Sequence, residues 1–149
     1  MRRSLQSQQA GLRQAICDLN NSIEEARRKN DEIDARIEEL EIAKGHAEQA
    51  VHAADDLMQR IFQTPSGEWA GTNWDEFEDR TRTGETYTSA KDLHQGCQAL
   101  VYEIQAKIDA ERSQRNLMAE LIEGYMSMVK WRQDMLASIG RQLVGQGGA

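Results

Sequence analysis

The residues of this chain that could do chemistry are few and widely spaced. The candidate nucleophiles, bases and soft-metal ligands are Cys17, Cys97, His46, His52 and His94. Only His94 and Cys97 lie close together, three residues apart in the string HQGC. A cysteine nucleophile needs an adjacent base and an oxyanion donor within a pocket. A metal site needs ligands at clustered spacings, and these five residues form no such cluster.

We therefore expect no catalytic residues, no cofactor-binding residues, no metal and no enzymatic activity. The sequence has no phosphate-binding glycine loop, no G-x-S-x-G, no H-E-x-x-H and no EF-hand loop. The net charge of -7 argues against a general nucleic-acid-binding protein, which needs basic side chains to neutralise phosphates. Only 5% of the 149 residues are aromatic, 29% are charged and one is proline, a composition typical of long helices.

The elements that hold these residues are predicted by a seven-residue repeat in the first half of the chain. Apolar residues recur at two heptad core positions, d and a, which indicates a helix that packs against at least one other helix. The d positions are Leu5, Leu12, Leu19, Ala26, Ile33, Leu40, Ala47, Ala54 and Ile61, and the a positions are Ile16, Ile23, Asn30, Ile37, Lys44, Val51 and Met58.

Two of the a positions are polar. Asn30 in a buried position penalises a shifted register, because its amide then lacks a partner. Lys44 can lay its methylene groups along the interface and keep its ammonium group in water. We interpret both residues as register determinants; an interface that is simply hydrated at these two positions explains them equally well.

A second helix is predicted in the other half. Its core positions alternate in steps of four and three, and they include an acid and a base, Glu111 and Arg115, spaced for an ion pair within the helix. These core positions are Cys97, Val101, Ile104, Ile108, Glu111, Arg115, Met118, Ile122, Tyr125, Val129, Arg132, Leu136, Ile139 and Leu143. Pro65 and Gly67 end the first helix. We predict an all-α fold, a long antiparallel two-helix hairpin in one domain spanning 1–149. Its parts are helix 5–63, turn 64–72, helix 73–143 with a possible interruption at 82–86, and a disordered tail at 145–149, with the chain folding back near residue 70.

The second helix carries more apolar surface than one neighbouring helix can bury. From Leu117 onward it has two adjacent apolar stripes, and an exposed patch of this kind marks an interaction site. We expect a protein partner there, either another helical protein or a second copy in a homodimer. The predicted partner-interface residues are Leu117, Met118, Leu121, Ile122, Tyr125, Met128, Trp131 and Met135.

The predicted turn contains Trp69, Gly71, Trp74 and Phe77. Trp69-Ala70-Gly71 followed by Phe77, with a helix on each side, resembles the W-x-G layout of the WXG-type (ESAT-6-like, Esx) helical hairpins of bacterial type VII secretion. The chain is similar to the small helical proteins encoded beside LXG toxins. The aromatic side chains of the turn either cover the open end of the two-helix interface or form a recognition surface.

This resemblance implies a non-enzymatic partner, or chaperone, that binds the helical N-terminal region of an LXG-type toxin or another small helical protein. Contact with the membrane is then indirect, through the secretion machinery. A self-associating coiled-coil scaffold without a role in secretion is the alternative. We expect a cytoplasmic protein, possibly secreted by the type VII route, with no Sec signal peptide and no transmembrane helix. The family's export signal, Tyr-x-x-x-Asp/Glu, is not found after Tyr87, Tyr102 or Tyr125.

Overall fold

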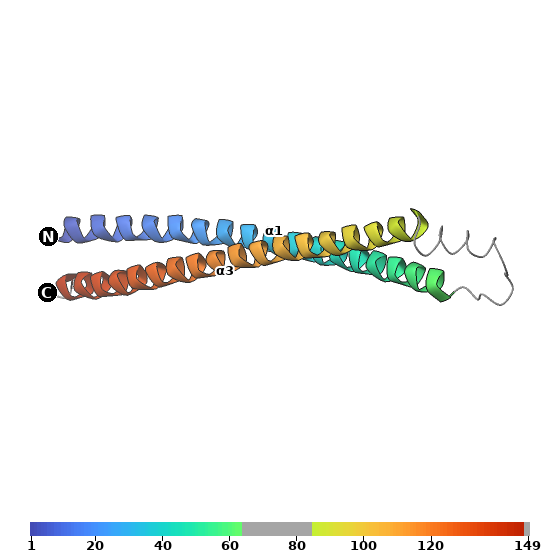
Figure 1. The fold of residues 1–149 in the computed structure, drawn as a ribbon. Coiled ribbons are helices and arrows are strands. Elements are labelled where there is room, and N and C mark those ends of the chain that lie inside the picture. Colours follow the sequence, from blue (N-terminus) through green and yellow to red (C-terminus); the bar gives the residue numbers. More distant parts are fainter. Residues whose placement is uncertain (64–84, 148–149) are drawn as a thin grey trace, which may run out of the picture. The chain divides into compact units, whose positions relative to one another are not determined.

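The computed structural model describes residues 1–63 and 85–147, which form two long helices. Helix α1 spans Arg2–Gln63 and helix α3 spans Glu85–Gly147 (Figure 1). The all-α helical hairpin is confirmed, and α1 ends at the residue predicted. α3 continues to Gly147, so the prediction of a tail disordered from residue 145 is wrong for the residues that the structure describes. The predicted turn motif, Trp69, Gly71, Trp74 and Phe77, and the interruption up to Gly84 lie outside the described residues.

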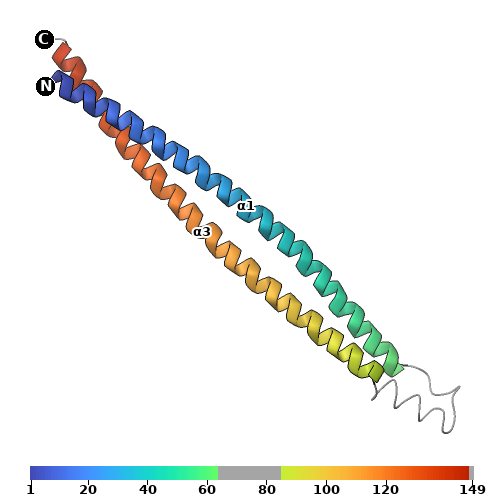
Figure 2. The ribbon, with the colours of Figure 1, turned by 90° about the horizontal axis from the view of Figure 1, so that it is seen from above.

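The chain divides into two compact units. Unit 1 comprises Met1–Arg36 with Glu111–Ala149, and unit 2 comprises Ile37–Ala110. In each unit a segment of α1 lies antiparallel beside a segment of α3 (Figure 2). Neither described helix contains a stretch that is both long enough and apolar enough to cross a membrane.

The core of each unit is a narrow row of aliphatic side chains, and all of them except Ala90 occupy predicted core positions. Every buried side chain among the described residues is apolar. In unit 1 the buried residues are Ile23, Ala26, Ile33, Val129 and Ile139, and in unit 2 they are Ile37, Ala47, Ala54, Ala90, Ile104 and Ile108. Burial of one stripe of each helix leaves most of the surface of both helices in contact with solvent.

Two ion pairs join α1 to α3 in unit 1. The Arg36 guanidinium donates from Nε to Glu111 Oε1 (3.1 Å) and from Nη2 to Glu111 Oε2 (3.2 Å), which is a bidentate arrangement. The Arg115 Nε lies 2.8 Å from Asp34 Oδ1. The predicted pairing of Glu111 with Arg115 within α3 is therefore wrong, because each of them pairs instead with an opposite charge on the antiparallel helix.

These pairs also define the register of α1 against α3 in unit 1, where Arg36 lies opposite Glu111 and Asp34 lies opposite Arg115. The predicted fold-back near residue 70 lies outside the described residues. The hydrogen bonds to Glu111, together with the negative charges of Glu111 and Glu32, raise the pKa of the Arg36 guanidinium against the opposing effect of desolvation.

The two polar a positions differ in how their polar atoms are satisfied. The Asn30 Oδ1 is buried and accepts no hydrogen bond from the described residues. Asn30 lies one turn before Asp34 on α1, so it belongs to the same polar part of unit 1. In unit 2, Lys44 is half-buried and its Nζ lies 3.6 Å from Glu48 Oε1, one turn further along α1.

Candidate functional site: an uncovered apolar face on α3

The eight residues predicted to bind a partner fall into two groups in the structure. Met118, Ile122 and Tyr125 are half-buried at core positions of α3. The other five side chains are exposed: Leu117, Leu121, Met128, Trp131 and Met135. The first group therefore contributes to the hairpin itself, whereas the second group has no described part of the chain to cover it.

The exposed group follows a regular pattern along α3. Each member comes one residue before a core position, and with Gly124 included, steps of four and three lead from Leu117 to Met135. We call the set Leu117, Leu121, Gly124, Met128, Trp131 and Met135 the outer stripe. Its spacing is that of a second coiled-coil core. One residue corresponds to about 100° around a helix, so α1 cannot cover the outer stripe and the core positions at once.

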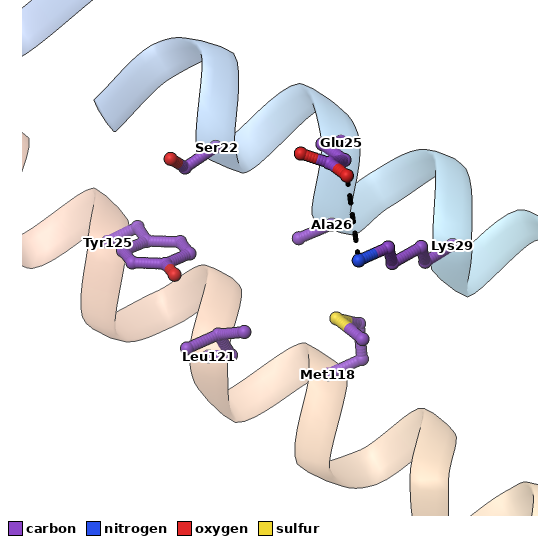
Figure 3. A pocket seen from close by; sticks show the side chains of 7 residues that line it. All are labelled: Ser22, Glu25, Ala26, Lys29, Met118, Leu121 and Tyr125. Carbon is purple, nitrogen blue, oxygen red and sulfur yellow. Dashed lines mark ion pairs between the residues drawn. The ribbon is translucent and has the colours of Figure 1, made fainter. Parts of the chain in front are cut away.

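A hollow lies between the two helices beside the outer stripe. Figure 3 shows that α3 lines it with Met118, Leu121 and Tyr125, and that α1 lines it with Ser22, Glu25, Ala26 and Lys29. Ala26 occupies a d position, and its single methyl group fills little of the interface. The Lys29 Nζ lies 3.5 Å from Glu25 Oε1, so the charges on the α1 side of the hollow are paired (Figure 3).

Trp131 has a cation beside it. The Arg132 guanidinium carbon lies 5.6 Å from the centre of the Trp131 ring, within the range of a cation–π contact. The Arg132 Nη1 also donates a hydrogen bond of 3.4 Å to the carbonyl oxygen of Met128. Both contacts hold the guanidinium over its own helix, and the outer surface of the indole remains largely exposed.

The opposite edge of the α1–α3 interface in unit 1 has a different character. A hollow there is lined by Asn20, Ile23 and Arg27 of α1 and by Met126, Val129, Lys130 and Gln133 of α3. The Arg27 Nη2 lies 4.0 Å from the Met126 sulfur. This edge has two cationic side chains and one large exposed apolar side chain, Met126, whereas the outer stripe has five large apolar side chains. The outer stripe is thus the more apolar side of α3.

Unit 2 has a smaller apolar surface of the same kind. Leu93 and Leu100 are exposed on α3, seven residues apart, and each comes one residue before a core position. Tyr102 is also exposed, beside a hollow that Val51, His52 and Val101 help to line.

The histidine and cysteine side chains do not assemble into a reactive centre in the part of the chain that is described. His94 and Cys97 are both half-buried, one turn apart on α3. Cys17 and Cys97 are free thiols. No three histidine, cysteine, aspartate or glutamate side chains among the described residues converge as metal ligands would. Among the described residues, the exposed apolar face of α3 is the feature that most needs a functional explanation.

The glycine within the outer stripe was not predicted as part of the site. Gly124 is flanked by Leu121 and Met128, at the spacing of the other stripe members. The available signal was its position in the alternating steps of four and three.

Comparison with protein-family models, with characterised proteins and with solved structures finds no match to this chain.

Proposed function

We propose that this chain is a non-enzymatic helical partner protein of type VII secretion. In this role it binds the helical N-terminal region of an LXG-type toxin, or another small helical protein, along the outer stripe of α3. The observation that supports binding is that five large apolar side chains are exposed at coiled-coil spacing on one helix. The link to secretion depends on the resemblance of Trp69, Gly71 and Phe77 to the W-x-G layout.

Helix-to-helix packing is the recognition mode that best suits this surface. An amphipathic helix places apolar residues in a line against such a stripe, and the shallow hollow of Figure 3 gives it a second wall on α1. Apolar patches of a few hundred Å² on a monomer commonly mark protein interfaces. A small molecule would find no enclosed apolar cavity in the hollows lined by the described residues.

The test is co-expression with the helical protein encoded beside the gene for this chain, followed by purification of the complex. We expect Leu121→Glu with Trp131→Glu to abolish the complex, because each places a charge inside the new interface. Their side chains are 44% and 59% exposed, so the hairpin itself should tolerate both changes. The matched control is Ile42→Glu with Leu57→Glu on α1, where the exposed fractions are 58% and 45%.

The results separate the alternatives. Loss of the complex in the α3 variant and its survival in the α1 variant support the proposal. A wild-type chain that forms a closed homodimer and ignores the neighbouring protein supports the self-associating scaffold instead. A complex that survives Leu121→Glu with Trp131→Glu shows that the outer stripe is not the interface.

A further inference from the structure

One stretch in the middle of α3 is exposed on every side. Residues 112–117 are all exposed, including Arg115, which occupies a core position of the repeat. Elsewhere in the described helices, away from their ends, no run of exposed residues is longer than three. A helix that packs along a neighbour buries one side of each of its turns, and 112–117 make more than one full turn at 3.6 residues per turn. This is therefore the part of α3 that α1 covers least.

The core row of α3 has a gap around the same residues. No side chain of α3 is buried between Ile108 and Val129, a length of about 30 Å at 1.5 Å per residue. The core positions in this interval, which are half-buried or exposed, are Glu111, Arg115, Met118, Ile122 and Tyr125. Two of them are charged. The interval with the least apolar burial on α3 thus contains 112–117.

The facing segment of α1 compensates little for this gap. Residues 30–36 of α1 lie opposite, as the two ion pairs that join the helices show. Among these seven residues only Ile33 is buried. The Asn30 Oδ1 is buried without a hydrogen bond from the described residues, and such an acceptor costs stability. Separation of the helices here would expose one buried side chain and would allow water to reach that oxygen.

Two ion pairs connect α1 and α3 at this level. In the pair Arg36–Glu111 the side chains are 47% and 22% exposed, and in the pair Arg115–Asp34 they are 52% and 42% exposed. Ion pairs that water reaches contribute little to stability, and dissolved salt weakens them further. These pairs therefore hold the segment only weakly, and their strength depends on ionic strength.

Local stability follows from these features. A segment with few buried apolar side chains and with a solvent-exposed backbone opens more often than the rest of a protein. Residues 112–117 lie far from both ends of α3, so the fraying of helix ends does not apply to them. Ser113 and Asn116 are also weaker helix formers than alanine, leucine or glutamate. The packing and the local sequence both favour opening at the same place.

We propose that residues 112–117 are an opening site of the hairpin. At this site α3 unfolds locally and separates from α1, while the helical segments before and after it stay folded. The two ion pairs keep the site closed at low ionic strength, so the hairpin responds to salt at one defined place. The inference is independent of the proposed function, because opening requires no partner.

Amide hydrogen exchange of the full chain, read residue by residue by NMR, tests this inference. Relative to the rates of an unfolded peptide, amides of 112–117 should exchange about tenfold faster, or more, than those of two reference segments of α3. The reference segments are 101–108 and 126–132, which contain buried side chains. In about 1 M NaCl the Debye length is about 3 Å. Exchange at 112–117 should then rise roughly threefold further, and the reference segments should not change.

The variant Glu111→Gln with Arg115→Gln removes one charge from each ion pair between the helices. It should speed exchange at 112–117 about threefold at low salt, and it should abolish the response to salt. The matched control is Glu103→Gln with Lys107→Gln. This acid and base have the same spacing on the same helix, but they pair with each other (3.7 Å) instead of with α1. The control should leave exchange at 112–117 unchanged.

A second variant should close the site. Arg115→Leu places an apolar side chain at the exposed core position, and Asp34→Ala, added to it, removes the carboxylate that would lose its partner. Because the leucine gains burial when the helices stay together, exchange at 112–117 should slow about fivefold.

Four results would overturn the inference. They are equal protection of 112–117 and the reference segments, an equal response of all three segments to salt, equal effects of the glutamine variant and its control, and no slowing by Arg115→Leu with Asp34→Ala. The first two require no variant, so the inference can fail even where a variant does not fold. Circular dichroism before exchange shows which variants keep their helices. Binding at the outer stripe is tested separately, by the co-expression experiment.

Discussion

Ile108 is the largest fully buried side chain in the described part of the chain, at 1% exposure, and its removal should weaken unit 2 measurably. Ile108→Ala deletes three carbon atoms, and each buried methylene contributes about 0.8 kcal/mol to stability. The transfer contribution is then about 2.4 kcal/mol. A residual cavity adds to it, as in other large-to-small core changes, which cost about 2–5 kcal/mol. A two-helix interface can collapse or admit water, so we expect a loss of about 3 kcal/mol.

Urea unfolding followed by circular dichroism measures this loss as a lower midpoint with an unchanged slope. Leu100→Ala is the matched control, since Leu100 lies on the same helix within unit 2 and its side chain is half exposed. It should cost less than about 1 kcal/mol, in proportion to its smaller buried area. Equal losses in the two variants would show that the a and d positions of α3 do not form the core.

Two further changes test the polar part of unit 1. Glu111→Arg should lower the melting temperature, because it places two guanidinium groups together. The exchange of charges in Arg36→Glu with Glu111→Arg should recover most of that loss. A double variant that is no more stable than Glu111→Arg alone would exclude a direct ion pair. Asn30→Ile should raise the free energy of unfolding by about 1 kcal/mol, because it removes a buried oxygen without a hydrogen bond. A loss of stability in urea unfolding would show that Asn30 has a partner in solution.

The helices and their core residues were predictable because the seven-residue repeat is long. Leu12 through Ala54 recur at one position of that repeat. Four members of the row are buried, namely Ala26, Ile33, Ala47 and Ala54, and the leucines of the row are half-buried. The C-terminal end was harder to predict. Glycines at 145 and 147 lower helix propensity, yet α3 continues to Gly147, where the position of a Cβ would lie 4.0 Å from Arg2 Nη1.

The register was not predictable from either helix alone. The spacing of Glu111 and Arg115 favours a pair within one helix, and that rule considers no other charges. In the hairpin Asp34 and Arg36 lie opposite and take both partners.

The candidate site was predicted in part. The excess of apolar residues after Leu117 indicated an interaction face, and five of the eight predicted residues are exposed. Met118, Ile122 and Tyr125 occupy core positions of the repeat, and they are half-buried there.

The central claim is that the outer stripe of α3 binds a partner helix, and methionine oxidation tests it most directly. Met126 and Met128 are 48% and 43% exposed, two residues apart, and only Met128 belongs to the outer stripe. Hydrogen peroxide oxidation, followed by tandem mass spectrometry, gives a rate for each methionine in the free chain and in the complex with its co-expressed partner. We expect the complex to slow oxidation of Met128 at least severalfold and to leave Met126 nearly unchanged. Equal protection of both residues, or protection of Met126 alone, would contradict the claim.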